Sequence, residues 1–126
     1  MNPWTDSEQN TARWTSTGLG ILDITVGEGA ELTKGQTATM NYTGWLLDGT
    51  CFDSSVDPAF GHVEPFATRI PGQVIAGWNE GTLGMKVGGK RKLYLPPDLA
   101  YGGRGAGRTI GPNATLVFEI ELVGVK

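Results

Sequence analysis

The feature that most constrains the fold is an alternation of apolar and polar side chains near the end of the chain. In residues 115–123, TLVFEIELV, one face carries Leu116, Phe118, Ile120 and Leu122, and the other carries Thr115, Val117, Glu119 and Glu121. Successive side chains of a β-strand point to opposite sides of a sheet, so this alternation predicts a strand with one buried face. Sheets with one packed and one solvated face are typically antiparallel.

Other segments fit the same sheet. In residues 22–26, LDITV, the apolar face consists of Leu22, Ile24 and Val26. In residues 37–45, TATMNYTGW, the face that is expected to point inward consists of Ala38, Met40 and Tyr42. A further strand is predicted at residues 91–95, RKLYL, before two prolines that end it. An Asp-Gly pair at residues 48–49 predicts a hairpin turn, and residues 53–64 are expected to form an irregular bulge.

Residues 74–85, VIAGWNEGTLGM, are the one segment that favours a helix, and their glycines limit it to about two turns. The fold class is therefore predicted to be α+β, with an antiparallel sheet packed on a single short helix. Trp78 lies between glycines in this segment, and two interpretations of it stay open. The indole either fills a small core or forms a surface that a ligand touches.

A chain of 126 residues is expected to form one domain, here residues 18–126. Residues 1–17 are polar and lack periodicity, which predicts a tail or an edge segment that Trp4 and Trp14 dock onto the domain. The net charge of −3 disfavours a nucleic-acid partner. The basic cluster at residues 86–92 is interpreted as a solvated strand end. No long apolar run predicts a membrane span and no secretion signal is recognised, so a cytoplasmic location is expected. The protein is also expected to be a monomer.

Side chains for covalent or metal chemistry are scarce. Cys51 and His62 are the single cysteine and the single histidine, and nothing supplies a third group that would orient them as a nucleophile pair. Residues 84–90, GMKVGGK, match the start of a phosphate-binding loop, but Arg91 stands where a hydroxyl would hold magnesium. No metal and no cofactor is therefore expected.

The remaining candidates are aromatic and apolar. They are Tyr42, Phe52, Phe66, Trp78, Tyr101 and Phe118, together with Val74 and Ile75. Each of them alone is compatible with a purely structural place in the core. Asp53 changes the interpretation, because a carboxylate among apolar neighbours requires hydrogen-bond partners. Beside tyrosine hydroxyls it indicates a pocket with one polar corner.

Long segments of the chain resemble a known family. In this order, NYTGWLLDGTCFDSS, VIAGWNEGTLGMKVGGKRKLYLP and LAYGGRGAGRTIGPNATLVFEIELV are similar to the signature segments of the FKBP-type peptidyl-prolyl isomerases, the receptors of macrolide immunosuppressants. The resemblance extends from Gly18 to Val123. It implies a twisted antiparallel β-sheet wrapped around one short α-helix.

The resemblance also implies roles for the candidate residues. Trp78 would form the floor of a proline pocket, with walls from Tyr42, Phe52, Phe66, Val74, Ile75 and Phe118. The Ile75 backbone N–H and the Tyr101 hydroxyl would hold carbonyl groups of the bound chain, and Asp53 would supply the polar corner. The expected catalytic residues are therefore Tyr42, Asp53, Trp78 and Tyr101. Gly77 is interpreted as leaving room for the ligand backbone.

The loop after Tyr101 departs from the family pattern. Ala106 stands where relatives often have a histidine, and Thr109 stands at a substrate-binding position where an Ile or Val lip is usual. The implied function is isomerisation of X-Pro bonds in a desolvated aromatic pocket, which assists protein folding. The implied partners are proline-containing polypeptides and macrolides such as rapamycin. The alternative, which the altered lip motivates, is a non-catalytic module that binds proline peptides or macrolides.

Overall fold

A computed structural model describes residues 2–60 and 63–126, so His62 lies outside the described residues. The helices are α1 (Asp6–Thr11) and α2 (Ala76–Gly81), with short 3-10 turns η1 (Pro58–Phe60) and η2 (Pro97–Leu99). The strands are β1 (Arg13–Trp14), β2 (Gly20–Thr25), β3 (Thr37–Leu46), β4 (Cys51–Ser54), β5 (Phe66–Arg69), β6 (Lys90–Leu95) and β7 (Leu116–Val125). The predicted helix and the strands predicted from alternation are all present.

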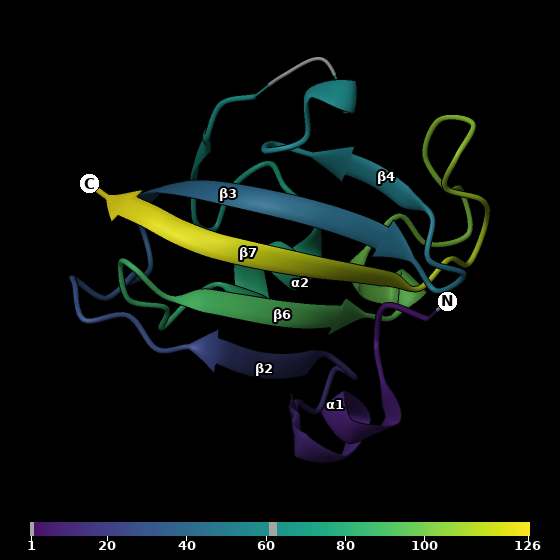
Figure 1. Ribbon diagram of the computed structural model, residues 1–126, viewed down its shortest axis with the longest axis horizontal. Coiled ribbons are helices and arrows are strands. Elements are labelled where there is room, and N and C mark those ends of the chain that lie inside the picture. The colour runs from purple at the N-terminus through teal and green to yellow at the C-terminus, as the bar shows by residue number, and fades with distance from the viewer. Residues whose placement is uncertain (1, 61–62) are drawn as a thin grey trace.

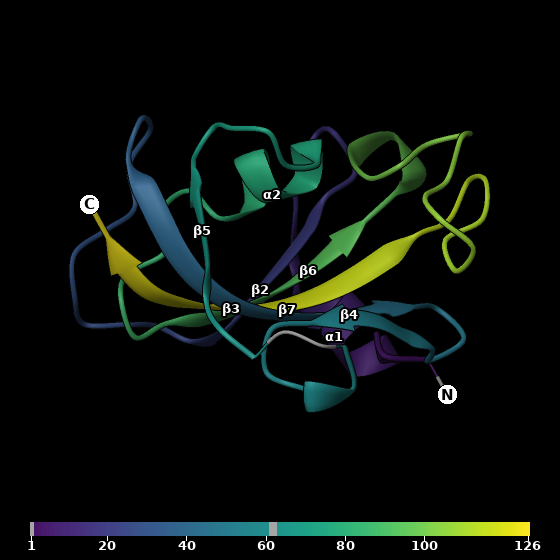
Figure 2. The same cartoon turned by 90° about the horizontal axis from the view of Figure 1, so that it is seen from above.

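The strands form one antiparallel sheet in the order β1-β2-β6-β7-β3-β4, and β5 pairs with the outer edge of β3 beside β4. The sheet curves around α2, which lies in its concavity (Figures 1 and 2). The predicted Asp-Gly pair joins β3 to β4, where the Gly49 N–H donates to the Leu46 carbonyl at 3.0 Å. The predicted fold class, an α+β sheet around one short helix, is confirmed.

The main core lies between the concave face of the sheet and α2. It is built from alternate residues of the central strands, which are fully buried: Ala38 and Met40 on β3, Leu93 and Leu95 on β6, and Leu116, Ile120 and Leu122 on β7. This arrangement confirms that the apolar face of the last strand is its buried face. Apolar burial of this kind contributes about 25 cal/mol for each Å² removed from water and is the main stabilising term.

The predicted strand at residues 22–26 overlaps β2, and its predicted apolar face points outward. Ile24 and Val26 are 47% and 70% exposed, whereas Leu19 and Ile21 are buried. The reason is register, because Ile21 pairs with the core residue Leu93 and therefore shares its face of the sheet. The alternation of apolar and polar residues predicts a strand, but it does not determine which face of the strand packs against the core.

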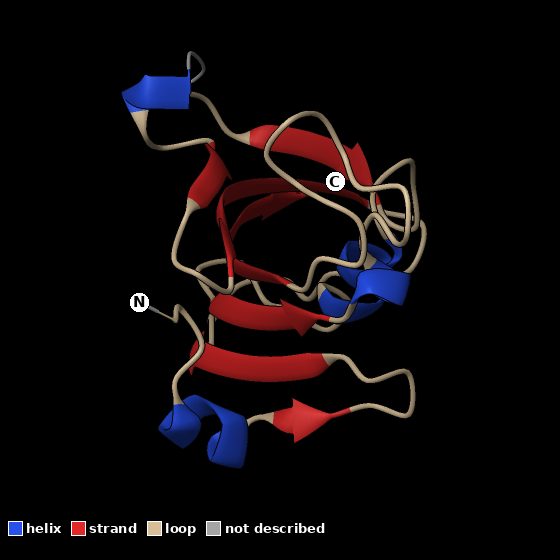
Figure 3. Ribbon diagram, turned by 90° about the vertical axis from the view of Figure 1, so that its right-hand side faces the viewer, coloured by secondary structure: helices blue, strands red, loops and turns tan. Residues whose placement is uncertain are grey.

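Residues 1–17 were predicted as a tail or edge segment; of these, residues 2–17 carry α1 and β1 and lie against the sheet at the edge formed by β2 (Figure 3). Trp4 is only 4% exposed and packs on Trp14 and Tyr94, with ring centroids 6.0 and 5.5 Å away. A capping box begins α1, in which the Glu8 N–H donates to Thr5 Oγ1 and the Thr5 N–H donates to Glu8 Oε1. The division of the chain at residue 18 stays a prediction.

The basic cluster at residues 86–92 is only partly a solvated strand end: Lys86 is exposed and the Lys90 side chain is 41% exposed, but the interpretation was wrong for Arg91 and Lys92. Arg91 is 6% exposed, and its guanidinium donates to the carbonyls of Gly81 at 2.8 Å and Leu83 at 3.0 Å and to Asp23 Oδ1 at 2.7 Å. Lys92 donates to the carboxylate of Glu8 on α1 at 2.8 Å. Adjacent residues of β6 point to opposite faces, so one cation binds the end of α2 while the next binds α1.

Gly77 does not leave room for a ligand, which corrects the interpretation of this glycine. A Cβ atom at residue 77 would lie 2.4 Å from Cγ and Cδ2 of Leu95. Gly81, one turn further along α2, is similarly close to Leu93. The glycines of α2 therefore let the helix approach β6 closely.

Candidate functional site

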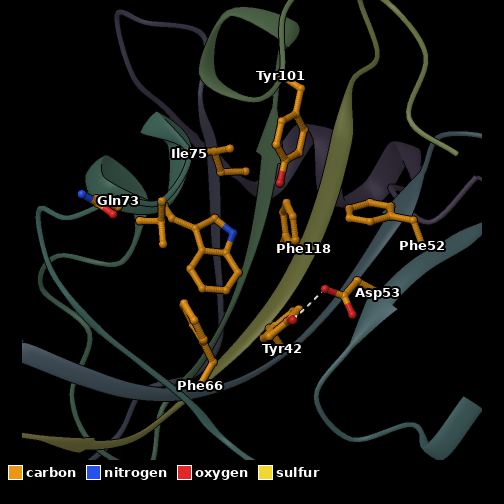
Figure 4. A pocket seen from close by; sticks show the side chains of 10 residues that line it. Tyr42, Phe52, Asp53, Phe66, Gln73, Ile75, Tyr101 and Phe118 are labelled. Carbon is orange, nitrogen blue, oxygen red and sulfur yellow. Dashed lines mark hydrogen bonds between the residues drawn. The ribbon is translucent and has the colours of Figure 1, made fainter. Parts of the chain in front are cut away.

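A pocket of about 430 Å³ opens between α2, the β3–β4 hairpin and the loop after η2 (Figure 4). It is lined by Tyr42, Phe52, Asp53, Phe66, Gln73, Val74, Ile75, Trp78, Tyr101 and Phe118. Every residue that the sequence predicted for the site is in this set except Thr109. The structure thus brings the candidates together in one place, and the roles assigned to them stay predictions.

Trp78 lies at the base of the pocket and is 5% exposed. Its indole meets the rings of Tyr42, Phe66 and Phe118 at centroid distances of 5.2, 6.0 and 5.4 Å, all near perpendicular. Such edge-to-face pairs add about 0.5–1.5 kcal/mol each beyond the area they bury. The indole nitrogen is buried and finds no acceptor among the described residues, so ring contacts position this side chain.

The polar corner of the pocket is a hydrogen-bonded pair. The Tyr42 hydroxyl donates to Asp53 Oδ2 at 2.7 Å, and the Ser54 N–H donates to Asp53 Oδ1 at 2.8 Å (Figure 4). Burial, followed by the hydrogen bond and negative charge of Asp53, raises the pKa of Tyr42 well above its ordinary value. Burial and the charge of Asp53 likewise raise the pKa of Tyr101. Both hydroxyls therefore stay protonated at neutral pH and remain hydrogen-bond donors.

A backbone donor lies on the other side of the pocket. Ile75 precedes the first turn of α2, and its N–H has no acceptor within the described part of the chain. Asn79 holds the segment that leads to it, because its side chain accepts from the Gly72 N–H at 2.9 Å and donates to the Gly72 and Val74 carbonyls. Sequence reasoning missed Asn79 on α2 and the lining residue Gln73 in the loop before it, since an isolated amide side chain carries no pattern.

Thr109 is exposed and does not line the pocket. It lies in the loop after Tyr101, where its neighbour Ile110 is 7% exposed and packs into the core instead. Ala106 is half-buried and pairs with Ile110 through hydrogen bonds of 2.8 and 3.2 Å. The predicted lip position at residue 109 therefore contributes nothing to the pocket wall.

The described residues offer few groups that could bind a metal ion or a cofactor. Among residues 2–60 and 63–126 there is no group of three or more His, Cys, Asp or Glu side chains that could hold a metal ion. None of the helices described is long and apolar enough to cross a membrane. The site offers aromatic surface, one paired carboxylate and a few hydrogen-bond donors.

Fold and pocket together define a class of protein: a small curved antiparallel sheet, closed by one short helix, with a tryptophan-floored aromatic pocket. The family model of FKBP-type peptidyl-prolyl cis-trans isomerase matches residues 28–123. The chain therefore belongs to the family of FKBP-type peptidyl-prolyl cis-trans isomerases, and its enzyme class is that of the family. The resemblance on which the sequence-based prediction depended is confirmed.

Similar proteins cover most of the chain. An FK506-binding protein of Neisseria meningitidis serogroup B is 51% identical over 109 residues, which is 86% of this chain and 96% of the relative. FK506-binding protein 1 of Dictyostelium discoideum is 46% identical over 86% of this chain and 99% of its own length.

Solved structures agree with this assignment. The crystal structure of FkpA from Escherichia coli superposes with a TM-score of 0.81 at 43% identity, over 91% of this chain and 51% of that one. A peptidyl-prolyl cis-trans isomerase of Pseudomonas syringae gives a TM-score of 0.81 at 34% identity, over 95% of this chain and 86% of the neighbour.

Proposed function

We propose that the pocket binds the proline ring of an extended polypeptide on the face of Trp78 and accelerates rotation about the preceding peptide bond. The observation that carries this proposal is the enclosure of Trp78 by three perpendicular rings in a pocket of about 430 Å³. A flat, apolar floor of this kind suits a saturated five-membered ring. The donors at the rim suit the carbonyl groups on either side of it.

The physical task of the site is modest. Rotation about a peptide bond faces a barrier of about 18–20 kcal/mol, because the twisted amide loses its resonance. The planar amide is more dipolar than the twisted one, so surroundings poor in water disfavour the planar form more strongly. Lowering the barrier by about 5–6 kcal/mol would accelerate rotation roughly 10⁴-fold. No covalent bond has to form or break.

Specific groups would share this task. The Ile75 N–H and the Tyr101 hydroxyl would each donate to a carbonyl of the bound chain, which orients it across the pocket. Asp53 would act from the polar corner, where its partner Tyr42 keeps the carboxylate in place at 2.7 Å. Phe52, Phe66 and Phe118 would exclude water from the amide.

The test is catalysed cis/trans exchange of a proline tetrapeptide, measured for Trp78→Leu and for Trp14→Leu. Trp14 lies on β1 at the far edge of the sheet and serves as the matched tryptophan control. We expect kcat/KM to fall by about tenfold or more for Trp78→Leu, a loss of at least about 1.4 kcal/mol of transition-state stabilisation, and to stay unchanged for the control.

A second variant guards against misfolding. Tyr101 is 40% exposed, so Tyr101→Phe removes only a hydroxyl from an accessible ring. Losing one neutral hydrogen bond of about 0.5–1.5 kcal/mol predicts a fall in kcat/KM of roughly twofold to tenfold. Wild-type rates in both pocket variants would refute the site, and an inactive wild-type protein would refute the function.

Macrolide binding is the finer part of the proposal. Relatives named FK506-binding proteins support it, as does the aromatic lining of the pocket. Rapamycin should quench or enhance tryptophan fluorescence and inhibit isomerisation at the same concentration, because both signals would come from one site. Binding without inhibition would contradict this. A cytoplasmic monomer without a nucleic-acid partner stays a prediction, which sedimentation and cell fractionation would test.

A further inference from the structure

The loop from Tyr101 to Asn113 is a compact, self-braced unit at the end of the sheet where β4 begins (Figure 1). The Asn113 N–H donates to the Gly102 carbonyl at 2.8 Å, which joins the two ends of the loop. The Gly105 N–H donates to the Tyr101 carbonyl at 3.2 Å, and Ile110 anchors the loop in the core. These hydrogen bonds and the burial of Ile110 fix the backbone conformation of the loop, and its remaining side chains project from that backbone.

Those side chains include two cations. Arg104 and Arg108 are exposed, and neither forms an ion pair with any of the described residues. Residues 99–115 contain no Asp or Glu, so nothing within the loop neutralises them. The loop is a local positive charge on a chain whose net charge is −3.

The positive charge of Arg104 and Arg108 lies in the loop that begins at the pocket-lining residue Tyr101. Tyr101 begins the loop and projects its hydroxyl into the pocket (Figure 4). A polypeptide that passes over Tyr101 on its way out of the pocket therefore passes the loop that carries both arginines. The one charged residue that lines the pocket, Asp53, lies at the polar corner with its oxygens bound by Tyr42 and Ser54.

We propose that Arg104 and Arg108 are specificity-determining residues that favour clients with an acidic side chain next to the proline. This inference rests on the proposed function, because it concerns the chain that the pocket would bind. Guanidinium groups attract carboxylates and repel ammonium groups, and an exposed loop lets long side chains reach a passing client. The effect is one of charge at moderate distance in water, so it is modest and sensitive to salt.

The experiment compares uncharged-ended peptides that carry Glu, Gln or Lys either directly before or directly after proline. Catalysed exchange is measured by NMR and divided by the uncatalysed rate of the same peptide. In about 10 mM salt, where the screening length is about 30 Å, we expect kcat/KM for the Glu peptide to exceed that for the Lys peptide by about fivefold in at least one position. In about 1 M salt, where it is about 3 Å, the ratio should approach one.

Two charge-matched variants locate the effect. The double variant Arg104→Gln with Arg108→Gln should lose the preference and keep the rate on the Gln peptide. The control is Arg13→Gln with Lys34→Gln, which removes the same charge from exposed residues outside this loop and the pocket lining and should keep the preference.

The outcomes are separable. Activity on the Gln peptide with equal rates for Glu and Lys in both positions would overturn this inference and leave the proposed function standing. A preference that survives in the loop variant would also overturn it. Inactivity on all peptides would refute the proposed function itself.

Discussion

Replacing Gly77 with alanine tests what the glycines of α2 are for. The added Cβ would lie 2.4 Å from Cγ and Cδ2 of Leu95 and 3.1 Å from the Leu99 carbonyl oxygen. Nonbonded carbon atoms pack at about 3.5–4.0 Å, so α2 or Leu95 must move by more than about 1 Å. Leu95 is fully buried on the central strand β6, which leaves it little space to move.

The expected cost follows from two opposing effects. Inserting a methyl group into a packed core typically costs about 1–3 kcal/mol. Alanine is favoured over glycine inside a helix by about 1 kcal/mol, which offsets part of that cost. We therefore expect the free energy of unfolding to fall by up to about 2 kcal/mol. Because α2 also carries Trp78, its displacement should lower kcat/KM as well.

Urea denaturation of a double-mutant cycle measures the clash directly. Leu95→Ala alone should cost about 2–5 kcal/mol, because it leaves a cavity. Combining it with Gly77→Ala removes the clash, so the double variant should lose less stability than the sum, by about 1 kcal/mol or more. Gly124→Ala is the control, since no atom lies within 4 Å of its added Cβ. We expect that control to match the wild type.

Any of three results would refute this reasoning. If Gly77→Ala unfolds at the wild-type urea concentration and only KM rises, the glycine borders the ligand and its close approach to Leu95 is unimportant. Strict additivity in the cycle would likewise show that the close approach of Gly77 to Leu95 is unimportant. A stable variant with unchanged kinetics would show that α2 accommodates the methyl group by a shift too small to disturb Trp78.

Two further predictions concern the N-terminal segment and the polar corner. Trp4→Ala should lower the free energy of unfolding by about 3 kcal/mol, as for other buried aromatic residues, while kcat/KM stays unchanged. A loss of activity in parallel with stability would contradict the view that the cluster of Trp4, Trp14 and Tyr94 is separate from the pocket. The pKa of Tyr42 is raised by burial and then by Asp53. The stability that its hydrogen bond contributes is therefore fully present below the unfolded pKa of about 10, and it is lost as pH rises through the higher pKa of the folded state. Isomerase activity should therefore show no loss from Tyr42 ionisation between about pH 7 and 10, and a fall in that range that Tyr42→Phe abolishes would contradict this.

Alternation of side chains predicted the strands that build the core, because alternate residues of these strands face the main core. It missed β5, whose four residues lie between two prolines and pair only with β3. Phe66 was nevertheless predicted for the site, first as an aromatic candidate and then by the family resemblance, and neither prediction depends on a strand pattern. A strand this short and this exposed has no periodicity that distinguishes it from a loop.

Helix α1 was missed for a different reason. None of its residues is buried, so no apolar stripe marks it as a helix. Its sequence does contain one usable signal, because Thr5 and Glu8 have the spacing of a capping box, and the structure forms both of its hydrogen bonds. The contacts of Trp4 with Tyr94 were beyond prediction, since they join residues far apart in the sequence.

The stability of the pocket floor depends more on β6 than on α2 itself. A helix of six residues that contains two glycines is unstable in isolation, because nucleation is costly and each glycine adds about 1 kcal/mol. Alternate residues of strand β6 compensate for this instability. Leu95 packs against Gly77 and Leu93 packs against Gly81. Arg91 donates to two carbonyls at and just beyond the end of the helix, at 2.8 and 3.0 Å.

One face of β6 therefore contacts helix α2 at Gly77, at Gly81 and at the end of the helix, and Leu99 of η2 also lies close to Gly77. The backbone of Trp78, at the centre of that helix, is therefore positioned from the side away from the ligand, whereas its indole is positioned by the rings of the pocket wall. The glycine-rich sequence around Trp78 suggested a pocket floor with room for the ligand. In the structure, these glycines instead allow a short helix to pack closely against the sheet. A pocket that must bind a chain without deforming requires such a floor.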